Sequence, residues 1–104
     1  MSNVKQVWND ILKELESQVS AFTFDLWIKT LQPVCVYKER LVLGTETEAH
    51  HNICEKRFRE TIKKAAQKVF PVIVDVEIIT PEMAPAFEEY KEFEINAPED
   101  RVLE

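Results

Sequence analysis

The sequence predicts an α+β fold in which one three-stranded sheet is packed against helices, in the order ααββαβ. Three patterns predict it. Apolar residues recur every three or four positions in two early segments and again after residue 47, two β-branched runs are separated by Lys38 and Glu39, and a last run alternates along its length. The chain of 104 residues is long enough for one domain with a single core.

Two helices open the predicted fold. The first begins at an Asn3 cap and extends for about four to five turns, with its apolar side chains in one stripe. The stripe comprises Val4, Val7, Trp8, Ile11, Leu12, Leu15 and Val19. The second helix begins at a cap formed by Ser20 or Thr23 and ends before Pro33. Its inward residues are Phe24, Trp27, Ile28 and Leu31. A helix this short is unstable alone in water, so the large apolar area of Trp27 is expected to anchor it.

A hairpin, a long helix and a strand follow. The runs "VCVY" (34–37) and "RLVLGT" (40–45) predict antiparallel strands with a tight turn, although the Asn-Gly pair typical of such turns is missing. Thr47 then caps a helix that continues to about Val69 and is closed by Pro71. Its inward residues are Ile53, Cys54, Phe58, Ile62, Ala65, Ala66 and Val69. The run "VIVDVEII" (72–79) alternates as a strand, with Val72, Val74, Val76 and Ile78 on one face.

The chain divides into two parts by charge and apolar pattern. Residues 1–80 carry eleven acidic and eleven basic side chains, whereas residues 81–104 carry eight acidic ones against Lys91 and Arg101. We predict a folded domain over residues 1–80 and an acidic, proline-containing disordered linker or tail over 81–104. Removal of that tail is expected to leave the stability of the domain nearly unchanged. An acidic segment that docks on a basic partner is the alternative, and Phe87, Tyr90 and Phe93 at three-residue spacing leave a transient helix open.

Composition disfavours several classes of function. A single glycine, Gly44, excludes the glycine-rich loops that cradle nucleotide phosphates. Cys35 and Cys54 stand far apart without a CxxC pair, so we expect buried reduced thiols. His50, His51 and Cys54 lack further ligands or an orienting residue nearby, which disfavours a metal site or a Cys–His nucleophile. Both histidines are expected on the helix surface. We therefore expect no cofactor, no metal and no enzymatic activity.

No uninterrupted apolar run approaches the roughly 18 residues that a membrane span needs. The start "MSNVKQ" also lacks the apolar core of an export signal. We therefore expect a cytoplasmic protein without a membrane contact.

Three segments carry a resemblance to a known family. Trp8 lies in the first helix, "TFDLWIKTLQPV" forms the second, and "EKRFRETIKKAAQKVF" follows the hairpin. With the ααββαβ order, these segments resemble the N-terminal domain of the bacterial replication initiator DnaA over about residues 3–80. The resemblance implies a KH-like fold and an interaction module without enzymatic activity, acting in the initiation of DNA replication.

The resemblance also implies two contact surfaces. Self-association would use the first helix, at Val4, Val7 and Trp8. The replicative helicase or regulators of initiation would bind the second helix together with the start of the third. The matching positions are Thr23, Leu26, Trp27, Thr47, Ala49 and His50. Where relatives carry Asn-x-Phe, this chain has Thr47-Glu48-Ala49, so a bulky aromatic contact is replaced by a methyl group.

Two alternative functions remain open. A KH-like module could bind single-stranded DNA weakly through the basic third helix, at Lys56, Arg59, Lys63 and Lys64. The acidic tail would oppose such binding. A stand-alone chain of this kind could instead act as a decoy of the initiator.

Overall fold

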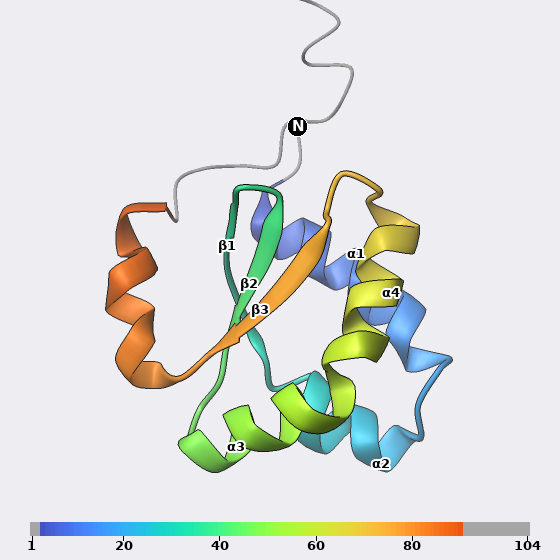
Figure 1. The fold of residues 1–104 in the computed structure, drawn as a ribbon. Coiled ribbons are helices and arrows are strands. Elements are labelled where there is room, and N and C mark those ends of the chain that lie inside the picture. The colour runs from blue at the N-terminus through green and yellow to red at the C-terminus, as the bar shows by residue number, and fades with distance from the viewer. Residues whose placement is uncertain (1–2, 91–104) are drawn as a thin grey trace, which may run out of the picture.

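A mixed three-stranded sheet is the centre of the structure (Figure 1), a computed structural model that describes residues 3–90. The strands β1 (Gln32–Tyr37), β2 (Arg40–Gly44) and β3 (Asp75–Ile79) lie side by side in that order. β1 and β2 are antiparallel, whereas β2 and β3 are parallel. A parallel pair requires a crossover, and the third helical region supplies it. The predicted α+β fold with a three-stranded sheet packed against helices is confirmed.

The helices differ from the prediction in their internal geometry. α1 (Val4–Glu16) is a regular helix, but the second helix is a short α2 (Ala21–Thr23) continued by a π-helical turn, η1 (Phe24–Ile28). The third region is likewise interrupted, as α3 (Glu48–Ile53), the π-helical turn η2 (Cys54–Phe58) and α4 (Arg59–Val69). Such wide turns often accompany functional sites. The two π-helical turns lie against each other.

The expected N-caps are formed. The Asn3 side chain accepts a hydrogen bond from the Gln6 backbone N–H at 2.9 Å, and Ser20 accepts from Thr23 at 3.1 Å. Thr47 accepts from the His50 backbone N–H at 3.0 Å. Ser20, rather than Thr23, therefore begins the second helix.

The main core lies between the sheet and the helices α1 and α4, which cover one of its faces (Figure 1). Apolar side chains of β2 and β3 that point to this face meet the inward stripes of both helices. The buried members include Val7, Ile11, Leu15, Ile28, Leu31, Leu41, Leu43, Ile62, Ile73 and Val76.

The turn between β1 and β2 has the left-handed geometry of a two-residue hairpin, without an Asn-Gly pair. Lys38 and Glu39 have φ angles of 52° and 64°. A type I′ turn needs a positive φ at both central residues because its twist matches that of the strands. The Lys38 ammonium lies 5.3 Å from the centre of the Tyr37 ring.

Two strand boundaries were predicted wrongly. β3 begins at Asp75 and not at residue 72, because the Ile73 backbone N–H donates to the Phe70 carbonyl at 2.9 Å and forms a turn. Val74, which the alternation places on the same face as the buried Val76 and Ile78, is 50% exposed. β1 begins two residues early, so Pro33 lies within an edge strand, next to a bulge between Pro33 and Cys35.

The chain after β3 continues as a 3-10 helix, η3 (Pro81–Tyr90), on the other face of the sheet (Figure 1). This part of the segment expected to be a disordered linker is therefore helical. Residues 91–104, including Phe93, lie outside the described part of the chain. The domain boundary at residue 80 stays a prediction.

A candidate protein-interaction surface on the second helix

The second helix and the start of the third are joined through one backbone carbonyl. The Trp27 carbonyl lies 2.9 Å from His50 Nε2, and the Cys54 thiol donates to the same oxygen at 3.3 Å. The rings of Trp27 and His50 lie 6.1 Å apart with an angle of 42° between their planes. A π-helical turn leaves carbonyls outside the regular ladder, so this carbonyl is free to take partners from another helix.

The hydrogen bonds of His50 identify its tautomer. The Glu46 backbone N–H donates to His50 Nδ1 at 3.2 Å, so Nδ1 is an acceptor and carries no proton. The proton therefore lies on Nε2, which donates to the Trp27 carbonyl and also lies 3.1 Å from the Thr30 hydroxyl. That hydroxyl donates to the Leu26 carbonyl at 3.0 Å. His50 is thus a neutral imidazole with both ring nitrogens hydrogen-bonded. We call this connection between the second helix and the start of the third the joint.

His50 is only 5% exposed, so the expectation that it is a surface residue was wrong. The reason is helical spacing, since His50 precedes the buried Cys54 by one turn and lies on the same inward stripe. His51 is half-buried and bonds only its neighbour Asn52 among the hydrogen bonds seen here.

The other expected contact residues are divided between surface and core. Thr47 and Ala49 are exposed at the start of α3, and Leu26 is 45% exposed. Thr23 is half-buried. Trp27 is also half-buried and packs against the main core, as its anchoring role requires. The structure therefore brings Trp27 and His50 into contact, and leaves Leu26, Thr47 and Ala49 available to a partner.

One residue of this surface was not expected from the sequence. Phe22 in α2 is 74% exposed, and it precedes Leu26 by four residues. Side chains four apart on a helix lie on the same side. In the sequence, Phe22 also lies off the inward stripe of Phe24 and Ile28, and this displacement could have indicated that its side chain is exposed. We call Phe22 and Leu26 the apolar pair.

The expected self-association residues lie mainly in the core. Val7 is fully buried, Trp8 is 2% exposed, and Val4 packs partly buried against the same cluster. Trp8 Nε1 is buried and has no hydrogen-bond partner within residues 3–90. A shallow pocket of about 490 Å³ lies beside this residue, between α1 and the start of β1. Its lining residues are Lys5, Trp8, Asn9, Leu12, Lys29, Leu31, Gln32 and Pro33. Self-association through Val7 and Trp8 stays a prediction, and in this conformation neither side chain reaches the surface.

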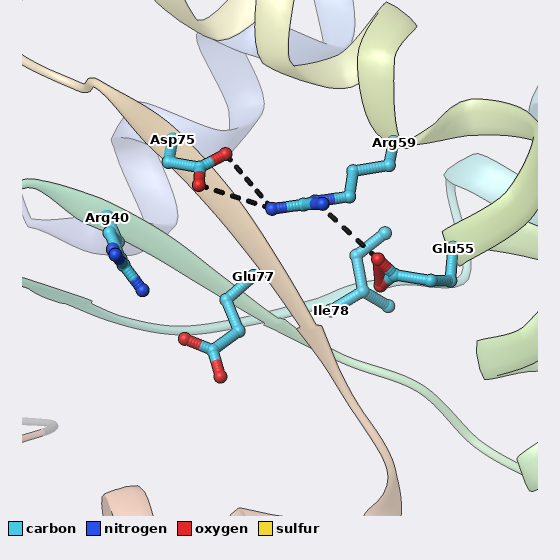
Figure 2. Close-up of a pocket in the computed structure, with 6 residues that line it drawn as sticks. All are labelled: Arg40, Glu55, Arg59, Asp75, Glu77 and Ile78. Atoms are coloured by element: carbon cyan, nitrogen blue, oxygen red, sulfur yellow. Dashed lines mark hydrogen bonds and ion pairs between the residues drawn. The ribbon is translucent and has the colours of Figure 1, made fainter.

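Two of the four basic residues considered for nucleic acid are paired with carboxylates, namely Arg59 (Figure 2) and Lys63. Arg59 Nη2 lies 3.2 Å from both carboxylate oxygens of Asp75, and its Nε donates to the Val76 carbonyl at 3.0 Å. The Lys63 ammonium lies 3.9 Å from Asp75, and Arg59 Nε lies 3.6 Å from Glu55. Lys56 and Lys64 are exposed.

Arg59, Asp75 and Glu55 line a polar pocket of about 280 Å³ at the edge of β3. It contains two guanidinium groups and three carboxylates, together with one apolar side chain (Figure 2). The lining residues are Arg40, Glu55, Arg59, Asp75, Glu77 and Ile78. Three carboxylates line the pocket against two guanidinium groups, which disfavours binding of a phosphate backbone there.

The Asp75 carboxyl is held in its charged form. Partial burial raises its pKa, but the Val76 backbone N–H and the positive charges of Arg59, Lys63 and Arg40 outweigh that cost. The pKa of Asp75 therefore lies below its usual value. Arg59 and Asp75 together bind the backbone of Val76 at the edge of β3, so their contacts serve the sheet.

Within residues 3–90, no three His, Cys, Asp or Glu side chains are placed to hold a metal ion together. The helices of the same residues are too short or too polar to cross a membrane.

The fold and the apolar pair define a small α+β domain whose distinctive surface lies on a short helix joined to the start of the next. Residues 5–68, more than half of the chain, match the DnaA N-terminal domain, so this chain belongs to that family.

Curated relatives carry the same assignment. The chromosomal replication initiator protein DnaA of Herpetosiphon aurantiacus is 29% identical over 84 residues, which is 81% of this chain and 18% of that protein. The DnaA of a Synechococcus strain is 31% identical over 75 residues, or 72% of this chain and 16% of that protein. The DnaA of Thermoanaerobacter pseudethanolicus is 22% identical over 100 residues. The chain thus spans about a fifth of the length of the curated relatives it matches.

Proposed function

We propose that this chain is a protein-interaction module of a replication initiator, and that it binds the replicative helicase or a regulator of initiation through its second helix. Its membership of the DnaA N-terminal domain family supports a role in initiation. The observation that carries the proposal is the apolar pair, with Phe22 at 74% and Leu26 at 45% exposure on one side of a helix. Large apolar side chains held on a rigid surface are the usual anchors of protein interfaces.

The joint beneath the apolar pair supports the same proposal. A contact surface needs a fixed geometry, because ordering a mobile segment reduces the affinity of binding. Here His50 and Cys54 hold the Trp27 carbonyl one residue after Leu26. The exposed Thr47 and Ala49 begin the helix that supplies His50. A partner would therefore meet the apolar pair and the start of α3 as one surface.

The experiment is a titration of the chain with a purified replicative helicase. The double variant Phe22→Ala/Leu26→Ala should weaken binding by about 2 to 4 kcal/mol, because it removes two apolar anchors. Val74→Ala is the matched control, since Val74 is 50% exposed and lies in the segment before β3, away from the second helix. Equal weakening by the double variant and the control, or none by either, would remove the apolar pair from the interface.

The nucleic-acid alternative has less support from the geometry. Arg59 and Lys63 are engaged with Asp75, which leaves Lys56 and Lys64 as exposed candidates. Weak binding of single-stranded DNA therefore stays a prediction with a narrower basis.

A further inference from the structure

The sheet has a second apolar face, opposite the one that α1 and α4 cover. Its buried residues are Val34, Cys35, Val42 and Ile79. Ala84 and Phe87 of η3 pack on this cluster, so the helix that follows β3 covers it (Figure 1). We call residues Pro81–Tyr90 the strap.

Two described side chains of the strap pack on this face. Ala84 and Phe87 are three residues apart, which is one turn of a 3-10 helix, so they lie on one side of it. Both are half-buried, whereas Met83, Pro85 and Ala86 are exposed. Among strap residues 81–87, whose side chains the structure describes, the apolar groups packed on the sheet are thus one aromatic ring and one methyl group.

The backbone of the strap adds little further stability. A 3-10 helix has poorer hydrogen-bond geometry than an α-helix, and runs beyond about four residues are uncommon. This one has ten residues with Pro85 inside it, and proline has no backbone N–H to donate.

The start of the strap is fixed, in contrast. Thr45 donates to the Ile79 carbonyl through its backbone N–H at 3.1 Å and through its hydroxyl at 2.8 Å. The Met83 N–H donates to the Thr80 carbonyl at 3.0 Å. A surface segment that is fixed at one end, and mostly exposed over residues 81–87, can open without disturbing the sheet.

We propose that the strap opens and closes over the second face of the sheet while the rest of the domain stays folded, so that this face, with Cys35, is alternately covered and exposed to solvent. This inference is independent of the partner surface described above, which lies on a different element. It describes a conformational device of the fold itself.

The two cysteines make the opening measurable. Cys35 lies beneath the strap, whereas Cys54 lies in the main core, and both are fully buried. Burial raises the pKa of Cys35 to about 11, with a contribution from the Glu77 charge, and burial raises the pKa of Cys54 to about 12. Neither thiol is reactive in the closed state. Reaction of Cys35 therefore reports opening of the strap, and reaction of Cys54 reports opening of the core.

The experiment is thiol labelling of the full chain under native conditions, with the modified cysteine identified by peptide mass. In the wild type, Cys35 should react at least about tenfold faster than Cys54, because local opening costs less than global unfolding. Phe87→Ala should accelerate Cys35 by a further factor of about ten and leave Cys54 unchanged, since it removes the main side chain of the cover. Met83→Ala, a change at an exposed side chain of the same strap, should alter neither rate.

Three results would overturn the proposal. Equal rates for the two cysteines in the wild type would mean that the strap opens only when the domain unfolds. An equal acceleration of both cysteines by Phe87→Ala would mean the same. A similar acceleration of Cys35 by Met83→Ala would show that the effect does not depend on contact with the sheet.

Discussion

At the scale of the residue, His50 shows how one buried polar side chain can fix a surface. Its two ring nitrogens are satisfied by the Glu46 N–H and the Trp27 carbonyl, which come from different elements. Removing the ring would take away the partner of the Glu46 N–H, leave the Trp27 carbonyl with the Cys54 thiol alone, and empty a buried site.

His50→Ala is therefore expected to lower the free energy of unfolding by about 2 kcal/mol. Chemical denaturation followed by tryptophan fluorescence measures it, because Trp27 contacts the ring. The matched control is His51→Ala, which removes the neighbouring, half-buried histidine and should change stability by less than about 0.5 kcal/mol. Equal losses for the two variants would show that the joint has no special role.

Ala49 gives a second prediction at this scale. It is exposed at the start of α3, where the resemblance places an aromatic residue in relatives. Ala49→Phe should strengthen binding to a helicase from such a relative by about 1 to 3 kcal/mol, through the added apolar area. Titration measures it, with Thr23→Arg as a variant expected to clash. Equal affinities for the wild type and both variants would place the contact elsewhere.

At the scale of the element, β3 is a short edge strand, and side chains bind backbone groups along its outer edge. Asp75 accepts from the Val76 N–H, Arg59 donates to the Val76 carbonyl, and Gln67 donates to the Val74 carbonyl. These groups are the ones that an added strand would need, so the edge is protected against pairing with another chain. Arg59 and Lys63, two of the four basic residues considered for nucleic acid, thus have structural partners.

This arrangement predicts a dependence of stability on pH. The folded state lowers the pKa of Asp75, so its carboxylate contributes stability above the unfolded pKa, and that contribution is lost as pH falls through the folded pKa. Asp75→Asn should therefore destabilise the domain near neutral pH and give a shallower loss of stability in acid. Denaturation between about pH 2 and pH 7 measures both effects. Glu77→Gln is the control, because it removes a carboxylate of the same pocket and leaves the Arg59–Asp75 pair in place. A steeper acid dependence in Asp75→Asn than in the wild type would contradict the assignment.

The sequence predicted the main elements well where apolar periodicity was long. The stripe of α1, the three caps and the hairpin were all visible as patterns. His50 could have been placed correctly from its spacing to Cys54, and Phe22 from its displacement from the inward stripe. The start of β3 could not have been predicted correctly. Val72, Ile73 and Val74 alternate like a strand, but a turn at Phe70 overrides that pattern. The π-helical turns have no sequence signature of comparable strength.

The second face of the sheet was also indicated by the sequence. The run Leu41, Val42, Leu43 is continuously apolar, as in strands buried on both faces, and does not alternate as a half-exposed strand would. The cover was harder to predict, since Ala84 and Phe87 are too few to form a periodic pattern.

At the scale of the whole molecule, the domain is a sheet with a thick layer on one face and a thin one on the other. The thick layer of α1 and α4 holds the fold, and the thin layer is the strap. The apolar pair belongs to neither, because it lies on the short helix at the end of the sheet (Figure 1). This separation allows partner binding and strap opening to vary independently.

Truncation of the chain tests how much the strap contributes to stability. The sequence predicts nearly unchanged stability without the tail, whereas the structure predicts a loss. A chain ending at Thr80 exposes Val34, Val42 and Ile79 to water, so its free energy of unfolding should fall by about 1 to 2 kcal/mol relative to the full chain, as for the loss of one half-buried aromatic contact. A chain ending at Tyr90 should match the full chain. Urea denaturation of the three chains measures the difference.

The stability lost on truncation must agree with the free energy of opening of the strap. The strap can stabilise the domain only by the free energy that its own opening costs, so the truncation loss should equal the opening free energy obtained from the labelling rate of Cys35. A truncation loss well above that opening free energy would mean that the strap is part of the cooperative fold. Equal midpoints for all three chains, with slow labelling of Cys35 in the full chain, would mean that residues other than the strap protect that thiol.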